Sequence, residues 1–161
     1  MCDLSPSREG VRARLLRIEP PLYLFVSLAT VFVLHIFLPG VKIISAPWNL
    51  GGVVVLVAGI VLNLMADASF KECETSVKPL GDTTTLVTTG AFRVSRHPMY
   101  LGFVLILLGA VILAGSATPF LVVAVFFAII DAVFVRFEEK KLSHTFGSAW
   151  WAYKANVRRW I

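Results

Sequence analysis

The stretch LGFVLILLGAVILAGSATPFLVVAVFFAIIDAVFV, residues 101–135, contains one ionisable side chain, Asp131, among its 35 residues. The turn residues GSATP (115–119) divide the stretch into two apolar halves, which predicts a hairpin of two helices. Such a hairpin would return its end, RFEE (136–139), to the level of its start, RHPMY (96–100). We therefore expect a basic and an acidic cluster to face each other at one membrane surface, as in a binding site.

The composition is typical of an integral membrane protein. Of the 161 residues, 57% are hydrophobic, and the mean hydropathy is +0.80. The apolar residues form long blocks, and a bilayer core requires roughly 17–25 apolar residues for each helical span. We predict a single all-α membrane domain over residues 1–161 with four transmembrane helices, at residues 22–38, 48–66, 99–114 and 120–135.

The distribution of lysine and arginine predicts the orientation. Fourteen of the 15 basic residues lie in the arm 1–20, the central segment 67–98 and the tail 136–161, and the other is Lys42. By the positive-inside rule, both termini and the central loop would lie in the cytoplasm. The net charge of +5 also favours contact with anionic lipid. Nucleic-acid binding is disfavoured, because the basic residues are dispersed and no groove-reading motif occurs.

The central segment combines loop signals with an apolar part. Pro79, Gly81 and Gly90 indicate a loop. The partly apolar run LVTTGAF (86–92) is expected to fold back against the helices. The sequence has no P-loop, no GxGxxG or GxSxG motif and no zinc-type Cys/His spacing, so no metal site is predicted.

The start of the third predicted span has the features of an anion site. Pro98 fits the first turn of a helix, where its missing N–H costs nothing. The free backbone N–H groups there, with Arg96 and His97 beside them, would attract a carboxylate or a phosphate. His97 and Tyr100 are three residues apart and can point to one face. The alternative is a positively charged stop sequence with an interfacial tyrosine.

The acidic pair Glu138 and Glu139 follows the fourth predicted span. In the simpler interpretation, these residues pair with Lys140 and Lys141 on a solvated helix. The short turn of the hairpin argues for convergence with His97 instead. Carboxylates beside a site of cations and amides suit a ligand with both signs of charge, such as an amino acid moiety, or a hydroxyl-rich ribose.

Two motifs resemble a known family. The run LVTTGAFRVSRHPMYLG (86–102) resembles the cofactor motif of integral-membrane methyltransferases, namely the isoprenylcysteine carboxyl methyltransferases and the related phospholipid N-methyltransferases. The tail resembles their C-terminal signature through EEKKL (138–142), Phe146-Gly147, Tyr153 and VRR (157–159). The resemblance covers about residues 63–161. It implies a cytoplasmic cofactor pocket formed by the central loop, the start of the third helix and the end of the fourth.

The resemblance also implies S-adenosylmethionine as methyl donor and a lipid or small lipophilic molecule as acceptor. In the prenylcysteine branch, an arginine one turn before the cofactor glutamate takes the substrate carboxylate. That position is Phe134 here, with Arg136 two residues on, so the acceptor stays open. Arg136 and Glu139 are the candidate catalytic residues. The residues that would bind the cofactor are Thr84, Thr85, Leu86, Val87, Phe92, His97, Pro98, Met99, Tyr100 and Glu138.

Two other functions are compatible with the sequence. A sterol-type reductase resembles this architecture but uses NADPH; the paired glutamates, and the lack near them of an arginine cluster that would bind the 2′-phosphate, argue against it. A membrane scaffold of the same fold without catalytic activity would bind neither S-adenosylmethionine nor NADPH.

Overall fold

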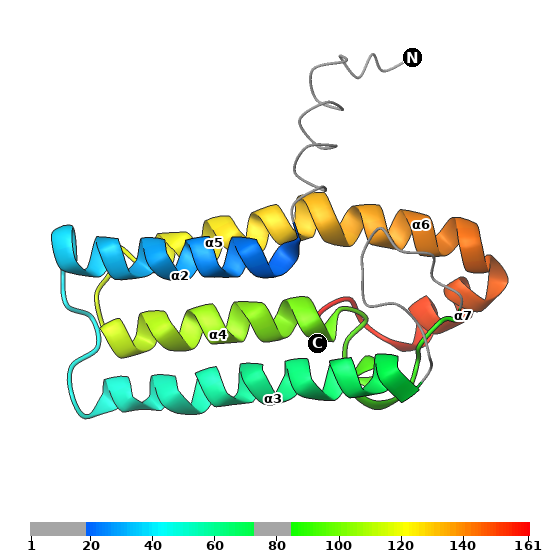
Figure 1. Ribbon diagram of the computed structural model, residues 1–161, viewed down its shortest axis with the longest axis horizontal. Helices are drawn as coiled ribbons and strands as arrows, with labels where there is room; N and C mark the ends of the chain where they lie inside the picture. Colours follow the sequence, from blue (N-terminus) through cyan, green and yellow to red (C-terminus); the bar gives the residue numbers. More distant parts are fainter. Residues whose placement is uncertain (1–18, 73–84) are drawn as a thin grey trace, which may run out of the picture.

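The computed structural model describes residues 19–72 and 85–161, and the regular elements in these two ranges are helices. Figure 1 shows them along a bundle, with α6 and α7 at one end. The helix α5 continues without a break through a π-helical turn, η3, into α6. In chain order the elements are α2 (Pro20–Phe37), η1 (Trp48–Leu50), α3 (Gly51–Glu72), η2 (Gly90–Arg93), α4 (Pro98–Ala114), α5 (Phe120–Ile129), η3 (Ile130–Val135), α6 (Arg136–Phe146) and α7 (Ser148–Asn156).

Three helical stretches are long and apolar enough to cross a membrane: Pro20–Phe37, Trp48–Glu72 and Phe120–Phe146. The helix Pro98–Ala114 is apolar but shorter, with 17 residues. In the described residues the predicted all-α fold is thus confirmed, with three helices that could span a membrane, while the four spans and the cytoplasmic pocket stay predictions. The second and fourth predicted spans end earlier than the observed helices, because polar turns continue both helices beyond their apolar parts.

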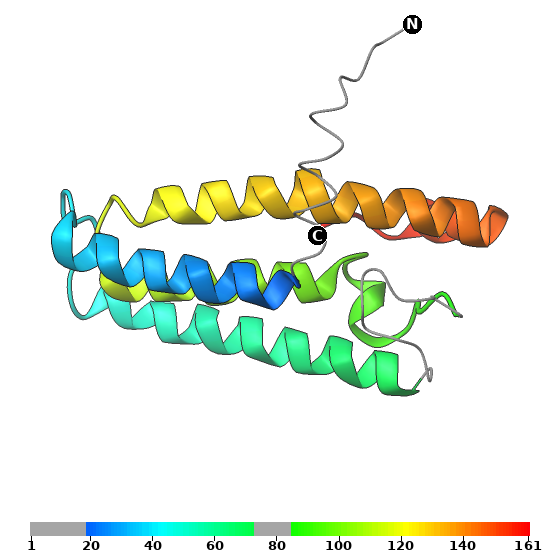
Figure 2. The same cartoon turned by 45° about the horizontal axis from the view of Figure 1, so that its top comes forward.

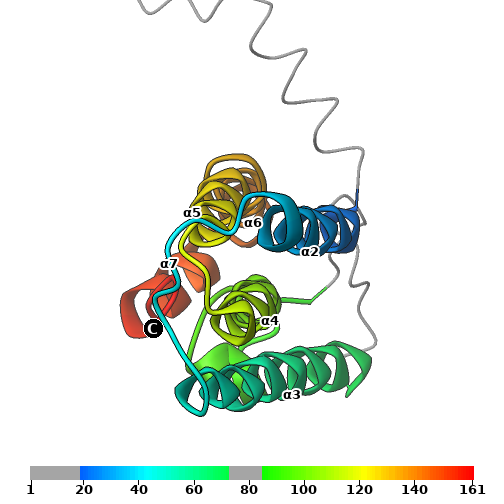
Figure 3. The ribbon, with the colours of Figure 1, turned by 90° about the vertical axis from the view of Figure 1, so that its left-hand side faces the viewer.

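The helices pack around α4. Seen from the end of the bundle, α4 lies between α3 on one side and α2 with α5 on the other (Figure 3), and α4 packs most extensively on α3. Figure 2 shows the same arrangement from another side. The main core lies between α2, α4 and the α5–η3 helix, and its most buried side chains include Leu107, Val111, Ile130, Phe134 and Val135.

Glycines allow α3 and α4 to approach closely. A Cβ atom on Gly59 would lie 2.7 Å from the carbonyl oxygen of Gly102, and a Cβ on Gly52 would lie 2.5 Å from that of Gly109. The two pairs are seven residues apart on each helix, so they lie on one face. Small residues at such contacts let helix backbones meet directly, as in membrane proteins generally.

The two connections at the other end of the bundle bind each other. The N–H of Ile43 donates to Gly115 O (2.8 Å), and the N–H of Ala117 donates to Val41 O (2.9 Å). The left-handed φ of Gly115, 71°, lets α4 end there and the chain reverse. The hairpin turn predicted at residues 115–119 is therefore present.

Candidate functional site

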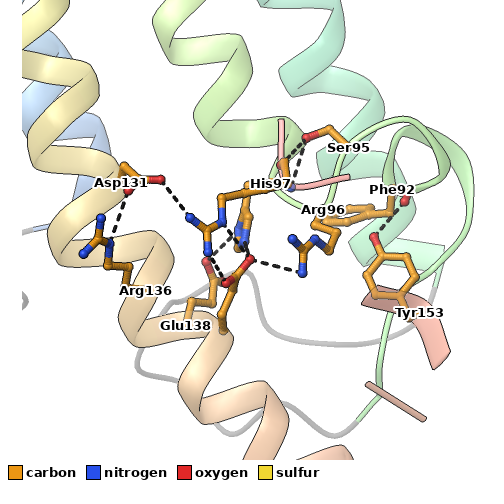
Figure 4. Close-up of polar contacts among 10 residues, drawn as sticks. Phe92, Ser95, Arg96, His97, Asp131, Arg136, Glu138 and Tyr153 are labelled. Atoms are coloured by element: carbon orange, nitrogen blue, oxygen red, sulfur yellow. Dashed lines mark hydrogen bonds and ion pairs between the residues drawn. The ribbon is translucent and has the colours of Figure 1, made fainter. Parts of the chain in front are cut away.

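The hairpin brings the basic and acidic clusters together, as the sequence predicted. His97 precedes α4, and Glu138 and Glu139 lie in the first turn of α6. The Nδ1 atom of His97 is 3.4 Å from Oε2 of Glu138, and its Nε2 atom is 3.6 Å from Oε1 of Glu139 (Figure 4). The imidazole is buried, with 3% of the side chain exposed. It therefore lies between two carboxylates.

Glu139 is held from several sides. Arg159 donates from Nε to Oε1 (3.0 Å) and from Nη2 to Oε2 (2.7 Å). Arg96 Nη1 is 3.3 Å from Oε1 of the same carboxylate. Only 10% of the Glu139 side chain is exposed, whereas 27% of Glu138 is exposed. Glu139 is thus engaged within the protein, and Glu138 is the more accessible carboxylate.

Asp131 forms a second acidic point beside the cluster. It lies in the π-helical turn η3, and π turns occur frequently at functional sites. Arg159 Nη1 is 3.5 Å from its Oδ1, and Arg136 Nε is 3.3 Å from its Oδ2. The Arg136 side chain is 63% exposed. Arg136, predicted to be catalytic, thus pairs with Asp131 and makes no ion pair with Glu138 or Glu139 among the described contacts.

The C-terminal tail completes the site. Its Arg158 carbonyl accepts a hydrogen bond from the N–H of Arg96 (3.0 Å). The Ser95 hydroxyl donates to Arg159 O (3.0 Å) and accepts from the N–H of His97 (3.2 Å). The ring of Trp160 is 6.5 Å from that of His97. No individual role was predicted from the sequence for Ser95, Arg159 or Trp160. The VRRW run (157–160) was the available signal, since it sits among apolar and aromatic residues.

The predicted loop residues fall into different surroundings. Thr84 lies outside the described residues, Thr85 is exposed and Leu86 is half-buried. Val87 and Phe92 are buried in a small core against α3, with Met99 packed beside them. The expected fold-back of residues 86–92 is thus confirmed.

Two of the predicted residues lie next to His97. Pro98 is buried at the first turn of α4. The ring of Tyr100 stacks on the imidazole at 5.9 Å between ring centres. His97 therefore has carboxylates at both ring nitrogens and an aromatic ring against its face.

The electrostatics of the cluster favour a protonated His97. Burial by itself would lower the pKa of His97, but the carboxylates of Glu138 and Glu139 outweigh burial and raise the pKa above its usual value. With His97 charged, the cluster contains four cations, Arg96, His97, Arg136 and Arg159, and three anions, Asp131, Glu138 and Glu139.

Three buried nitrogen atoms in this cluster make no hydrogen bond within residues 19–72 and 85–161. These are Nε and Nη1 of Arg96 and Nε2 of His97, of which Nη1 and Nε2 lie 3.3 and 3.6 Å from Glu139 Oε1. Buried donors normally have partners, and a bound ligand is one way to provide them. In the same described ranges, no group of three or more His, Cys, Asp or Glu side chains is arranged to hold a metal ion.

The family model described as phospholipid methyltransferase matches residues 48–149. The match runs from η1 into α7, so it includes His97 before α4 and Glu138 and Glu139 of α6. Comparisons with curated proteins and with solved structures gave no match. Since the family model covers more than half of the 161 residues, this chain belongs to the phospholipid methyltransferase family.

Proposed function

We propose that the protein is an S-adenosylmethionine-dependent methyltransferase that acts on a lipid or a small lipophilic molecule at the cytoplasmic membrane surface. Membership of a methyltransferase family supports the reaction class. The observation that carries the proposal is the cluster at the start of α4, where His97 lies between Glu138 and Glu139. A site with both signs of charge suits the amino acid moiety of the methyl donor.

The residues of this cluster fit the donor. The buried Nε of Arg96 lacks a hydrogen-bond partner in the described part of the chain, and a carboxylate of the donor could accept from it. The first N–H groups of α4 also point toward this end of the helix. Glu138, the more exposed carboxylate of the pair, would accept from the ammonium group or from ribose hydroxyls.

The protein contributes mainly orientation to such a reaction. When bound, S-adenosylmethionine supplies an electrophilic methyl group, and its transfer is an in-line displacement with no covalent enzyme intermediate. The chain's own groups fix the donor by charge and hydrogen bonds, and the apolar helices exclude water on the membrane side. Glu139 is engaged by Arg159 and Arg96, so we assign it the role of holding His97 in place.

The acceptor would come from the membrane. Several helix faces expose large apolar side chains, for example Phe25 and Phe32 of α2 and Val54 of α3, as expected for surfaces in contact with lipid. A lipophilic acceptor can move within this layer, while the donor enters from water. The site lies at the end of the bundle where α4 begins and η3 ends. At this level the apolar residues of both helices give way to charged residues.

The orientation belongs to the same proposal. We propose four spans, with α4 as the third, and both termini and the site in the cytoplasm. The two connections at the opposite end, residues 38–47 and 115–119, contain Lys42 as their single basic residue, which supports this orientation. Tags at the two termini should then be accessible from the cytoplasmic side only. Exposure of the two ends on opposite sides would exclude an even number of spans.

Calorimetric titration of the purified protein with S-adenosylmethionine and with NADPH tests the function. We expect the protein to bind S-adenosylmethionine and not NADPH. Glu138→Gln should bind S-adenosylmethionine more weakly, whereas Lys140→Gln, which changes an exposed residue of the same helix, should retain the wild-type affinity. Binding of NADPH alone would favour a reductase, and binding of neither would favour a scaffold. Membranes incubated with labelled methyl donor would then identify the acceptor through the labelled product.

A further inference from the structure

Residues 158–160 of the C-terminal tail lie against the residues that precede α4. The carbonyl groups of Arg158 and Arg159 accept hydrogen bonds from Arg96 N and Ser95 Oγ, at 3.0 Å each. Ser95 Oγ also accepts from the N–H of His97 and is buried. The position of the tail is therefore linked directly to that of the imidazole.

The guanidinium group of Arg159 is fully engaged with carboxylates. Nε and Nη2 bind the two oxygens of Glu139, at 3.0 and 2.7 Å, and Nη1 is 3.5 Å from Asp131 Oδ1. A bidentate pair of this kind fixes the plane of the carboxylate as well as its distance. Arg159 thus connects three segments, namely the tail, the π-helical turn and α6.

The neighbouring residues of the tail differ from Arg159. The ring of Trp160 packs against Phe127 of α5, with ring centres 4.8 Å apart, and approaches His97. The side chain of Arg158 is exposed and makes no hydrogen bond or ion pair in the described part of the chain. Two adjacent arginines therefore have the same charge but different surroundings, so Arg158 is a matched control for Arg159.

We propose that Arg159 is a positioning residue of the methyltransferase site, which holds Glu139 against His97 and fastens the tail over the start of α4. This inference rests on the proposed function. Without Arg159, the Glu139 carboxylate would retain Arg96 and His97 as partners, and its plane would no longer be fixed. His97 and Glu138 would then lose the fixed arrangement that the donor requires.

A purely electrostatic role predicts the opposite result. S-adenosylmethionine carries a net positive charge, since its sulfonium and ammonium groups outnumber its carboxylate. Removal of any nearby cation should therefore strengthen its binding slightly. If Arg159 acts by positioning Glu139, its removal should weaken binding instead, and removal of Arg158 should not.

The experiment uses the full chain in lipid nanodiscs, with Cys2→Ser and Cys73→Ser and a nitroxide label on Ile161→Cys, which is 74% exposed. We expect Arg159→Ala to increase the mobility of the label without ligand and to weaken S-adenosylmethionine affinity at least tenfold. Arg159→Lys should lie in between, because an ammonium group cannot bind both oxygens of Glu139 and Asp131 at once. Arg158→Ala should change affinity and label mobility by less than twofold.

A double variant tests whether Arg159 acts through Glu139. If it does, Arg159→Ala with Glu139→Gln should bind the donor no more weakly than the weaker single variant. A label that stays immobile in Arg159→Ala, or equal affinities of Arg159→Ala and Arg158→Ala, would overturn the inference. A wild-type protein that binds no S-adenosylmethionine would refute the proposed function. In that case the mobility of the label would be the only test of whether Arg159 fastens the tail. An unchanged spectrum in Arg159→Ala would show that it does not.

Discussion

Nδ1 of His97 lies 3.4 Å from Oε2 of Glu138, although the two residues are separated by a whole helical hairpin. On the other side of the ring, Nε2 is 3.6 Å from Glu139. Since the carboxylates raise the pKa of His97 despite its burial, the folded protein binds a proton at this ring more strongly than the unfolded chain does. Stability should therefore depend on pH through this residue.

The sign of the pH dependence follows from the raised pKa. The stabilising effect is fully present below the usual histidine pKa of about 6.5 and is lost as the pH rises through the higher pKa of the folded state. We expect the unfolding temperature in detergent to fall as the pH is raised above 6. The substitution His97→Gln should flatten this dependence of unfolding temperature on pH. His144→Gln, which changes an exposed histidine of α6, should retain the slope. Equal profiles in both variants would contradict this account of the cluster.

The two glutamates should respond differently to the same substitution. Glu139→Gln removes a charge that pairs with Arg159 and Arg96, so it should lower the free energy of unfolding by about 1–3 kcal/mol. Glu138→Gln changes a more exposed group whose described ion pair is with His97 alone, so it should lower stability less than Glu139→Gln, while donor affinity falls about tenfold, or about 1.4 kcal/mol. Chemical unfolding and calorimetric titration of both variants measure the two effects. The reverse pattern would exchange the roles assigned to these residues.

A buried hydrogen bond joins α7 to the loop before α4. The hydroxyl of Tyr153 donates to Phe92 O at 2.7 Å, and burial raises the pKa of Tyr153 to about 12, so the donor stays protonated at physiological pH. Tyr153→Phe should destabilise the protein by about 1–2 kcal/mol, because the Phe92 carbonyl loses this partner. The unfolding midpoint measures this effect. An unchanged midpoint would mean that another group, such as water, satisfies the carbonyl.

The central part of the site could be predicted from the sequence, because its geometry depends only on the lengths of two helices and of the turn between them. The two apolar halves of the hairpin are similar in length and the turn is short, so His97 and the paired glutamates had to return to one level. The packing of residues 86–92 against the helices could also be predicted, because the apolar side chains of Val87 and Phe92 needed an apolar surface to cover them.

Other features could not be predicted, for physical reasons. The tail contacts the site through the carbonyls of Arg158 and Arg159 and through one guanidinium group, and none of these contacts produces a periodic pattern. The π-helical turn that carries Asp131 also leaves no compositional trace. Arg136 was proposed as catalytic from the family resemblance, and its role stays a prediction; its described contact is with Asp131.

The packing of α3 on α4 offers a test of the fold that is independent of function. A Cβ atom on Gly59 would lie 2.7 Å from Gly102 O and 2.8 Å from Ile106 N, and both are backbone atoms that cannot move without separating the helices. A Cβ on Gly51, at the start of the same helix, would meet nothing within 4 Å. We expect Gly59→Ala to lower stability by about 1–3 kcal/mol, as overpacking does, and Gly51→Ala to leave stability unchanged or slightly raised.

Thermal unfolding in one detergent measures both glycine variants, and the comparison controls for the general effect of replacing glycine by alanine in a helix. That general effect favours alanine by roughly 0.8–1.0 kcal/mol in a helix interior, so it opposes the expected loss at Gly59. A lower midpoint for Gly59→Ala alone would therefore report the close approach of α3 and α4 directly. Equal midpoints would mean that the two helices can separate by a few tenths of an ångström at little cost. The contact between the glycines would then not determine the position of α4, which begins directly after His97.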